Sequence, residues 1–208
     1  MKVRKMKWVG TGNEPEVQAA SKRGSVIASA ANLFNERGFH LTTLDDVAAA
    51  LHVTKATLYY YIKDKDEILL ECHKQALQGL TEVLGVVRNR ERPVLERFKL
   101  FLAEFGRCMS ADYGKCLVRT GIRQLKPESR DIVMHLVRDL EAALLDLIEE
   151  GMANGEFRPG SAKLMRNFVF GAFQGNAVWH SKSGAMGIDE IASEYTNFLF
   201  AGIRAQKL

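Results

Sequence analysis

The 208-residue sequence has few cysteines and lacks the motifs of the common enzyme classes. Its three cysteines, Cys72, Cys108 and Cys116, are odd in number and none sits in a Cys-x-x-Cys pair, which argues against a disulfide framework and a structural zinc site. Phosphate-binding, dinucleotide-binding, zinc-protease and nucleophile-elbow motifs are all missing. We therefore expect no metal, no cofactor and no enzymatic activity.

Long hydrophobic runs and strand patterns are also missing. No stretch approaches the roughly 18 to 20 apolar residues that span a bilayer, and no apolar segment follows the basic start. These absences predict a cytoplasmic protein with no membrane partner. Polar and apolar residues show no sustained alternation, and Asn154-Gly155 lies between helical patterns rather than in a hairpin. The expected fold class is all-α.

Positive charge is concentrated in the first third of the chain. Residues 1–65 hold ten Lys and Arg against six Asp and Glu, and ten minus six is the whole net charge of +4. The remaining residues carry nineteen charges of each sign. Because an excess of one sign favours a partner of the opposite sign, this distribution indicates a polyanion bound near the N-terminus.

Helical patterns begin at residue 21, after an N-terminal stretch, residues 1–20, that we expect to be a flexible basic arm. Apolar residues then follow one helix face up to Gly38, which is placed to end the helix. The helices expected after Gly38 cover residues 43–51, 55–61, 64–88, 93–105, 117–125, 127–151, 161–180 and 189–204.

Start signals mark the two short helices. Thr43 and Asp46 have the spacing of a capping box, and Thr54 can cap the helix that follows the turn at His52. Two helices this short cannot bury a core alone. Packed on their neighbours they form a helix-turn-helix, whose second helix enters the DNA major groove while Leu58 faces inward. The tyrosines at 59–61 fit either DNA contact or half-buried packing.

The stretches 30–39, 42–48 and 53–69 closely resemble the N-terminal signature of the TetR family. The resemblance implies an all-α homodimer that binds a palindromic operator in double-stranded DNA. It implies a helix-turn-helix DNA-binding domain at residues 21–68 and an effector-binding and dimerisation domain at residues 69–208. The function implied is that of a repressor released from DNA by a small molecule of unknown identity.

The helix-turn-helix departs from the family pattern at two positions. His52 replaces the usual glycine of the turn, and histidine tolerates a positive φ better than most other residues. Tyr61 replaces a frequent histidine, and tyrosine can still donate to phosphate. Carried over by position, the implied DNA contacts are Thr43, Lys55, Ala56, Thr57, Tyr59, Tyr60 and Lys65.

The same resemblance implies that the last two helices pair with their copies in a four-helix bundle. Gly171 and Gly175, one turn apart, would let the helices approach closely. Packing within one protomer is the alternative for each candidate. The predicted dimer residues are Phe168, Gly171, Gly175, Trp179, Tyr195 and Phe198.

An effector pocket is expected among the middle helices, where the family has its ligand sites. Apolar residues at helical spacing are more often ordinary core than pocket lining, and Arg119 and Arg123 fit either an anionic ligand or a solvated face. The predicted pocket residues are Phe101, Phe105, Met109, Cys116, Arg119, Met134 and Trp179.

Two alternatives to ligand-induced release stay open at this point. The segment around Cys116 resembles the Gly-Cys-Leu segment of a TetR branch that senses quinones and electrophiles, and the adjacent Lys115 can raise the thiolate fraction. The other alternative is a DNA-binding regulator that has no small-molecule inducer. A C-terminal domain without a cavity would favour the latter.

Overall fold

The computed structural model describes residues 15–181 and 184–203, and within these residues it contains helices and no strand. The expected all-α class is confirmed. The helices are α1 (Pro15–Arg37), α2 (Leu44–Leu51), α3 (Lys55–Tyr61), α4 (Lys65–Arg88), α5 (Val94–Ser110), α6 (Asp112–Thr120), the 3-10 turn η1 (Ile122–Gln124), α7 (Pro127–Ala153), α8 (Ala162–Trp179) and α9 (Ile188–Ile203).

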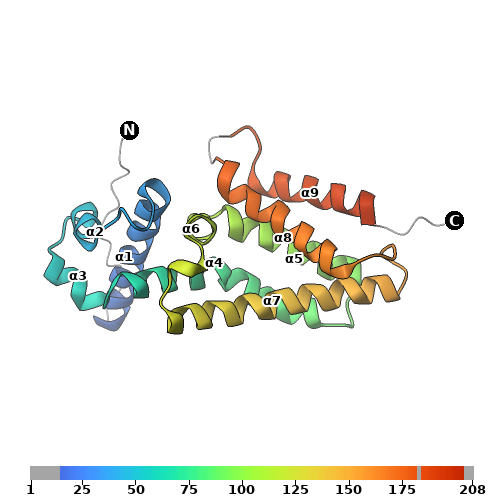
Figure 1. The fold of residues 1–208 in the computed structure, drawn as a ribbon, viewed down its shortest axis with the longest axis horizontal. Coiled ribbons are helices and arrows are strands. Elements are labelled where there is room, and N and C mark those ends of the chain that lie inside the picture. The colour runs from blue at the N-terminus through green and yellow to red at the C-terminus, as the bar shows by residue number, and fades with distance from the viewer. Residues whose placement is uncertain (1–14, 182–183, 204–208) are drawn as a thin grey trace.

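The molecule is elongated, with α1, α2 and α3 at one end and α5, α7, α8 and α9 towards the other (Figure 1). Helix α4 belongs to both parts, because it packs on α1 and also on α5, α6 and α7. Helix α6 packs on α1 as well, and it is therefore a second contact between the two ends. No helix in the described part of the chain is both long and apolar enough to cross a membrane.

Local signals set the N-terminal helix boundaries. Gly38 adopts φ +87° and donates to the Phe34 carbonyl at 3.0 Å, which ends α1 as expected. Thr43 and Asp46 form the capping box of α2, and His52 takes the left-handed conformation, φ 56° and ψ 40°, at its end. The Thr54 hydroxyl accepts from the Thr57 amide at 3.1 Å and caps α3.

Two expected boundaries differ from the structure. Helix α1 begins at Pro15 rather than at residue 21, because proline fits the first turn, where its missing N–H has no helical acceptor. The expected basic arm is therefore helical at residues 15–20, and residues 1–14 lie outside the described residues. The helix expected at 117–125 was wrong, because α6 starts at Asp112 and stops before Gly121, whose φ of +72° turns the chain into η1.

A continuous apolar core runs from the helix-turn-helix into the C-terminal helices. Val47, Leu51 and Leu58 are buried at one end, which confirms the inward face of α3. Phe105 stacks on Phe173 at 5.5 Å between ring centroids at the other end. Because α4 contributes buried residues along its length, a tilt of α4 changes packing in both parts.

Candidate nucleic-acid interface and effector cavity

Helix α3 presents one buried side chain and a surface of exposed ones. Leu58 is fully buried and anchors the helix, whereas Tyr59 is 51 % and Tyr60 is 81 % exposed. Ala56 is also exposed, and Thr57 is partly exposed. Two large aromatic side chains kept in solvent on a seven-residue helix are costly for a protein alone and fit a surface that is covered by a partner.

The polar groups at the start of α2 and α3 are held by local interactions. The Lys55 ammonium lies 2.9 Å from an Asp45 carboxylate oxygen, and this hydrogen bond raises the pKa of Lys55. The Thr43 hydroxyl lies 2.6 Å from Asp46, and its hydrogen bonds lower the pKa of Asp46. Two of the predicted DNA contacts, Thr43 and Lys55, are therefore exposed, and their side chains are oriented before any DNA is present.

Lys65 does not join this surface. Its ammonium donates to the Phe39 carbonyl and sits 4.1 Å from the centre of the Phe39 ring. Desolvation by burial lowers the pKa of Lys65. The side chain connects the start of α4 to the α1–α2 turn, so a phosphate contact would require it to leave Phe39. Lys63, two residues earlier, is exposed.

Helices α8 and α9 carry an exposed apolar surface. Phe168, Trp179 and Phe198 are 65 %, 55 % and 69 % exposed, and Gly171 is exposed as well. Tyr195 is only partly exposed, because its ring packs against Phe173 at 5.3 Å. Sequence reasoning missed two further members of this surface, the exposed residues Leu164 and Val178.

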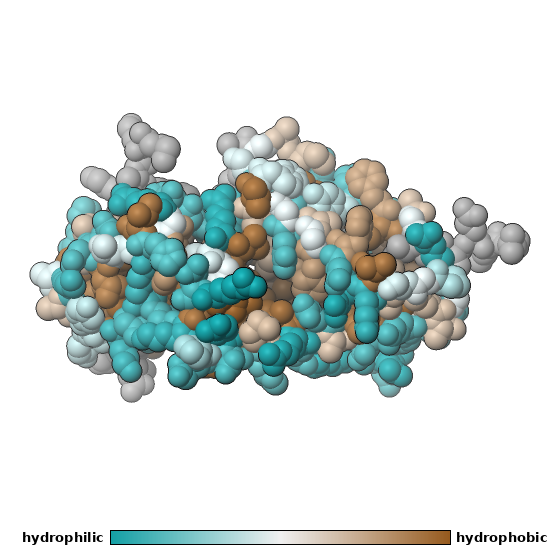
Figure 2. Space-filling model, viewed as in Figure 1, coloured by the Kyte–Doolittle hydropathy of each residue, from teal (hydrophilic) through white to brown (hydrophobic). Residues whose placement is uncertain are grey.

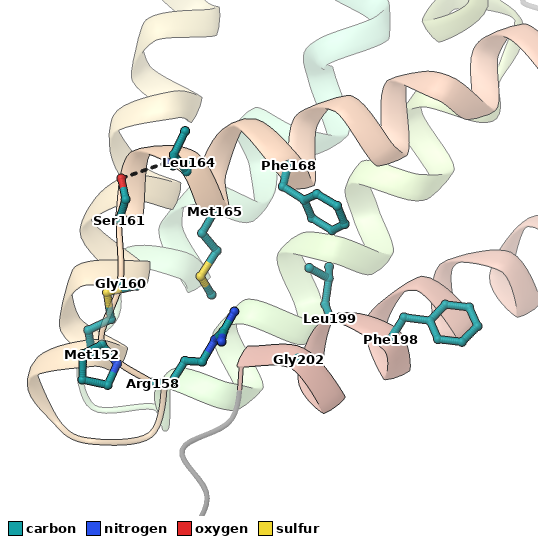
Figure 3. Close-up of a pocket in the computed structure, with 11 residues that line it drawn as sticks. Met152, Arg158, Gly160, Ser161, Leu164, Met165, Phe168, Phe198, Leu199 and Gly202 are labelled. Atoms are coloured by element: carbon teal, nitrogen blue, oxygen red, sulfur yellow. Dashed lines mark hydrogen bonds between the residues drawn. The ribbon is translucent and has the colours of Figure 1, made fainter.

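A groove of about 500 Å³ lies at one end of this apolar surface. Figure 3 shows Phe168 projecting from α8 and Phe198 from α9, with Leu199 between the two helices. Arg158 approaches from the α7–α8 connection and supplies the only charged side chain among the residues drawn (Figure 3). The groove and the exposed aromatic residues together make one apolar face.

A larger cavity, of about 830 Å³, lies between α4, α5, α6, η1, α7 and α8. Three of the predicted pocket residues, Phe105, Met109 and Met134, line it. Four do not. Phe101 and Cys116 are buried in the core, and Trp179 is exposed near the end of α8. The Arg119 side chain donates to the Asn35 carbonyl at 3.0 Å, so it joins α6 to α1 instead.

Cys116 has no exposure to solvent, and the Lys115 ammonium donates to the His180 carbonyl at 3.0 Å. A hydrogen bond to Cys116, together with burial, raises the pKa of the neighbouring Cys72 thiol. Reactive cysteines are accessible and lie near positive charge, and neither sulfur here meets that description. Electrophile sensing through Cys116 is therefore not supported.

Polar contacts join the wall of the cavity to the start of α4. Asp64 caps α4 and accepts from the Lys126 ammonium at 2.6 Å, and this hydrogen bond lowers the pKa of Asp64. Asp66 accepts from the Lys126 amide at 2.7 Å and from the Ser129 hydroxyl at 2.5 Å. Since η1 lines the cavity and is followed after one residue by Lys126, the wall of the cavity is in direct contact with the start of α4.

The sequence matches two family models and several characterised proteins. Residues 26–72 match the family model described as bacterial regulatory proteins of the tetR family, and residues 91–203 match the tetracyclin repressor-like C-terminal domain. The transcriptional repressor KstR2 of Mycolicibacterium smegmatis is 23 % identical over 189 residues, which cover 89 % of this chain and 92 % of that one. The fatty acid metabolism regulator protein of Bacillus subtilis is 21 % identical, with coverages of 89 % and 97 %.

Solved structures agree with this result. KstR2 of Mycobacterium tuberculosis superposes with a TM-score of 0.81 at 20 % identity, over 95 % of this chain and 98 % of that one. AibR, in complex with isovaleryl coenzyme A and operator DNA, gives a TM-score of 0.76 at 20 % identity, with coverages of 86 % and 97 %. Since the C-terminal model alone spans more than half of the sequence, the chain belongs to the TetR family of transcriptional regulators, which are DNA-binding transcription factors and not enzymes.

Proposed function

We propose that this regulator is a repressor that binds a palindromic operator as a homodimer and leaves it when a small molecule fills the C-terminal cavity. One observation carries the proposal: the exposed helix α3 and a cavity of about 830 Å³ are connected through α4 and the hydrogen bonds from Lys126 to the start of α4. The relative AibR, with its acyl thioester and operator DNA, supports both kinds of ligand. A cavity of this size argues against the alternative, a regulator without a small-molecule inducer, which needs no cavity.

The DNA-binding domain, at residues 21–68, places α3 in the major groove. Lys55, Ala56 and Thr57 lie at its first turn and read base edges, and Tyr59 and Tyr60 contact the backbone. Approach of a phosphate weakens the Lys55–Asp45 pair, because both charges lie at the surface and are screened by water. Thr43 adds a phosphate contact at the start of α2.

The dimerisation surface lies in residues 69–208, on α8 and α9. Five residues on α8 recur with alternating spacings of four and three and so form one stripe along the helix: Leu164, Phe168, Gly171, Gly175 and Val178. Antiparallel pairing of α8 with its copy about Gly171 sets Leu164 opposite Val178 and brings Phe168 to within one residue of the position opposite Gly175. A Cβ at Gly171 would meet nothing within 4 Å, so packing inside the protomer does not require glycine there. Close approach of a second copy does.

Release follows from a difference in affinity between two arrangements of α4. A ligand that expands the cavity moves η1 and the start of α7, and the contacts of Lys126 and Ser129 pass this movement to Asp64 and Asp66. Helix α3 then tilts, and the two reading helices of the dimer no longer match successive major grooves, about 34 to 36 Å apart. Ligand and operator therefore oppose each other by the same coupling free energy.

DNA binding is tested on an operator selected from a random duplex pool. Lys55→Ala and Tyr60→Ala should each weaken binding about five- to a hundredfold in a fluorescence anisotropy titration, since single contacts contribute about 1–3 kcal/mol. Lys74→Ala, an exposed lysine on α4, is the matched control. Unchanged affinity in both α3 variants would refute the assignment of α3 as the reading helix.

Dimerisation is tested by sedimentation equilibrium. Phe168→Glu and Gly171→Leu should shift the protein to monomers, because each places a charge or bulk where α8 meets its copy. Ile132→Glu, which changes an exposed apolar residue on α7, should leave the dimer intact. If all three variants sediment alike, α8 does not form the interface.

A further inference from the structure

Three arginines around the large cavity have no acidic partner among the described residues. In the part of the chain that the structure describes, the arginines that lie within 4 Å of a carboxylate are Arg23, Arg37, Arg88, Arg90, Arg92, Arg97, Arg107 and Arg166. Arg123, Arg130 and Arg138 line the cavity, and none of them has such a partner among the described residues. Three unpaired guanidinium groups therefore border one opening.

These arginines stand at the rim, above an apolar interior. Arg123 and Arg138 are exposed and Arg130 is partly exposed, whereas Leu80, Phe105 and other lining side chains are buried. Figure 2 shows hydrophobic residues between strongly hydrophilic ones near the middle of this face, where α6 and the start of α7 lie in Figure 1. Asp131 is the one acidic residue in the lining, so the rim carries a net positive charge of two.

We propose that the effector is an amphipathic acid, whose apolar body fills the cavity and whose anionic head lies between Arg123, Arg130 and Arg138. This rests on the proposed function, since it names the chemical class of the effector. Guanidinium groups suit the head because they bind carboxylate and phosphate through two parallel hydrogen bonds. A neutral ligand would use the apolar interior and leave all three arginines without a function.

The spacing of the arginines indicates a head with more than one negative charge. Arg130 and Arg138 are eight residues apart in α7, or about 12 Å along the helix axis. One carboxylate binds one or two of the three groups, whereas a thioester of a phosphorylated carrier reaches all of them. A free carboxylic acid and such a thioester both have an apolar body and an acidic head. We expect them to differ in their affinity for the protein.

The position of the head also connects it to DNA release. Arg123 lies in η1 and Arg130 in the first turn of α7, on either side of the Lys126 and Ser129 contacts to the start of α4. An anion that draws the two arginines together therefore changes the geometry between η1 and α7. The charged part of the effector acts on the connection, and the apolar part supplies most of the affinity.

Isothermal titration calorimetry on the full-length protein tests this with decanoic acid, decanoyl-coenzyme A and 1-decanol. We expect both acids to bind at least about tenfold more tightly than the alcohol, since each hydrogen bond to a charged group contributes roughly an order of magnitude. Arg123→Gln, Arg130→Gln and Arg138→Gln should each weaken binding of decanoyl-coenzyme A about five- to tenfold and leave binding of the alcohol unchanged. Arg158→Gln, an unpaired arginine of the other groove, should have no effect.

Each outcome decides a different point. Tighter binding of decanoyl-coenzyme A than of decanoic acid supports the multiply charged head, and equal affinities support a single carboxylate. If 1-decanol binds as tightly as the acids and the arginine variants do not differ, the acidic head is wrong while the small-molecule effector stands. Binding that survives Met134→Trp, which fills the cavity, places the ligand elsewhere and overturns the inference, as does failure of both acids to bind.

Discussion

Lowering the pH should destabilise this protein through one buried histidine. His73 on α4 is fully buried, and its Nε2 lies 3.0 Å from the Thr120 hydroxyl. That hydroxyl donates its own proton to the Cys116 carbonyl at 2.7 Å, so it accepts from Nε2–H, and Nδ1 is the nitrogen that would take up a further proton. Within the described residues Nδ1 has no partner, and a proton added there would be buried without an acceptor.

The magnitude follows from the pKa. Burial lowers the pKa of His73 from 6.5 to about 4. Above pH 6.5 the histidine is neutral in the folded and the unfolded chain and contributes no pH dependence. Between pH 6.5 and 4 only the unfolded chain takes up the proton, so stability falls as the pH falls. The loss approaches about 1.4 kcal/mol per pH unit and totals about 3 kcal/mol at pH 4.

Urea unfolding between pH 7.5 and 4.5, followed by circular dichroism, measures this loss. His73→Gln keeps a donor towards Thr120 and cannot take up a proton, so its stability should fall by about 2 kcal/mol less than that of the wild type over this range. His135→Gln removes an exposed histidine and should follow the wild type. Parallel curves for wild type and His73→Gln would show that His73 is protonated in the folded protein and refute the reasoning.

Three further substitutions test the packing by the same unfolding measurement. His52→Gly should stabilise the protein by about 0.5–1 kcal/mol, because glycine adopts the positive φ of the turn without strain; a loss would contradict this. Glu150→Ala leaves the buried Arg97 guanidinium without its carboxylate and should cost about 3–5 kcal/mol. Gly114→Ala should cost at least about 3 kcal/mol, because the new Cβ would lie 1.9 Å from the Cys108 carbonyl oxygen, and backbone cannot move aside cheaply; near-wild-type stability in either variant would show that the local packing yields.

Which residues border the cavity depends on how the C-terminal helices pack, and no pattern in the sequence distinguishes these residues from ordinary core. Phe101 and Phe105 lie one turn apart on the same apolar face of α5, yet only Phe105 borders the cavity. Helical periodicity identifies the face that is buried, but the neighbour that covers each residue depends on how the other helices pack. For the same reason Arg130 and Arg138 were missed, since a surface arginine on α7 looks the same whether it faces solvent or a cavity.

The sequence by itself determined the helix-turn-helix, because its signals act between residues that are close along the chain. The capping box of Thr43 and Asp46, the helix end at Gly38 and the left-handed turn at His52 each depend on four or five neighbouring residues. Only the tertiary structure turned Lys65 back to Phe39 and brought η1 and α7 against the start of α4. Those contacts join residues 26 to 63 positions apart, and their formation depends on the packing free energy of the whole fold rather than on local preference.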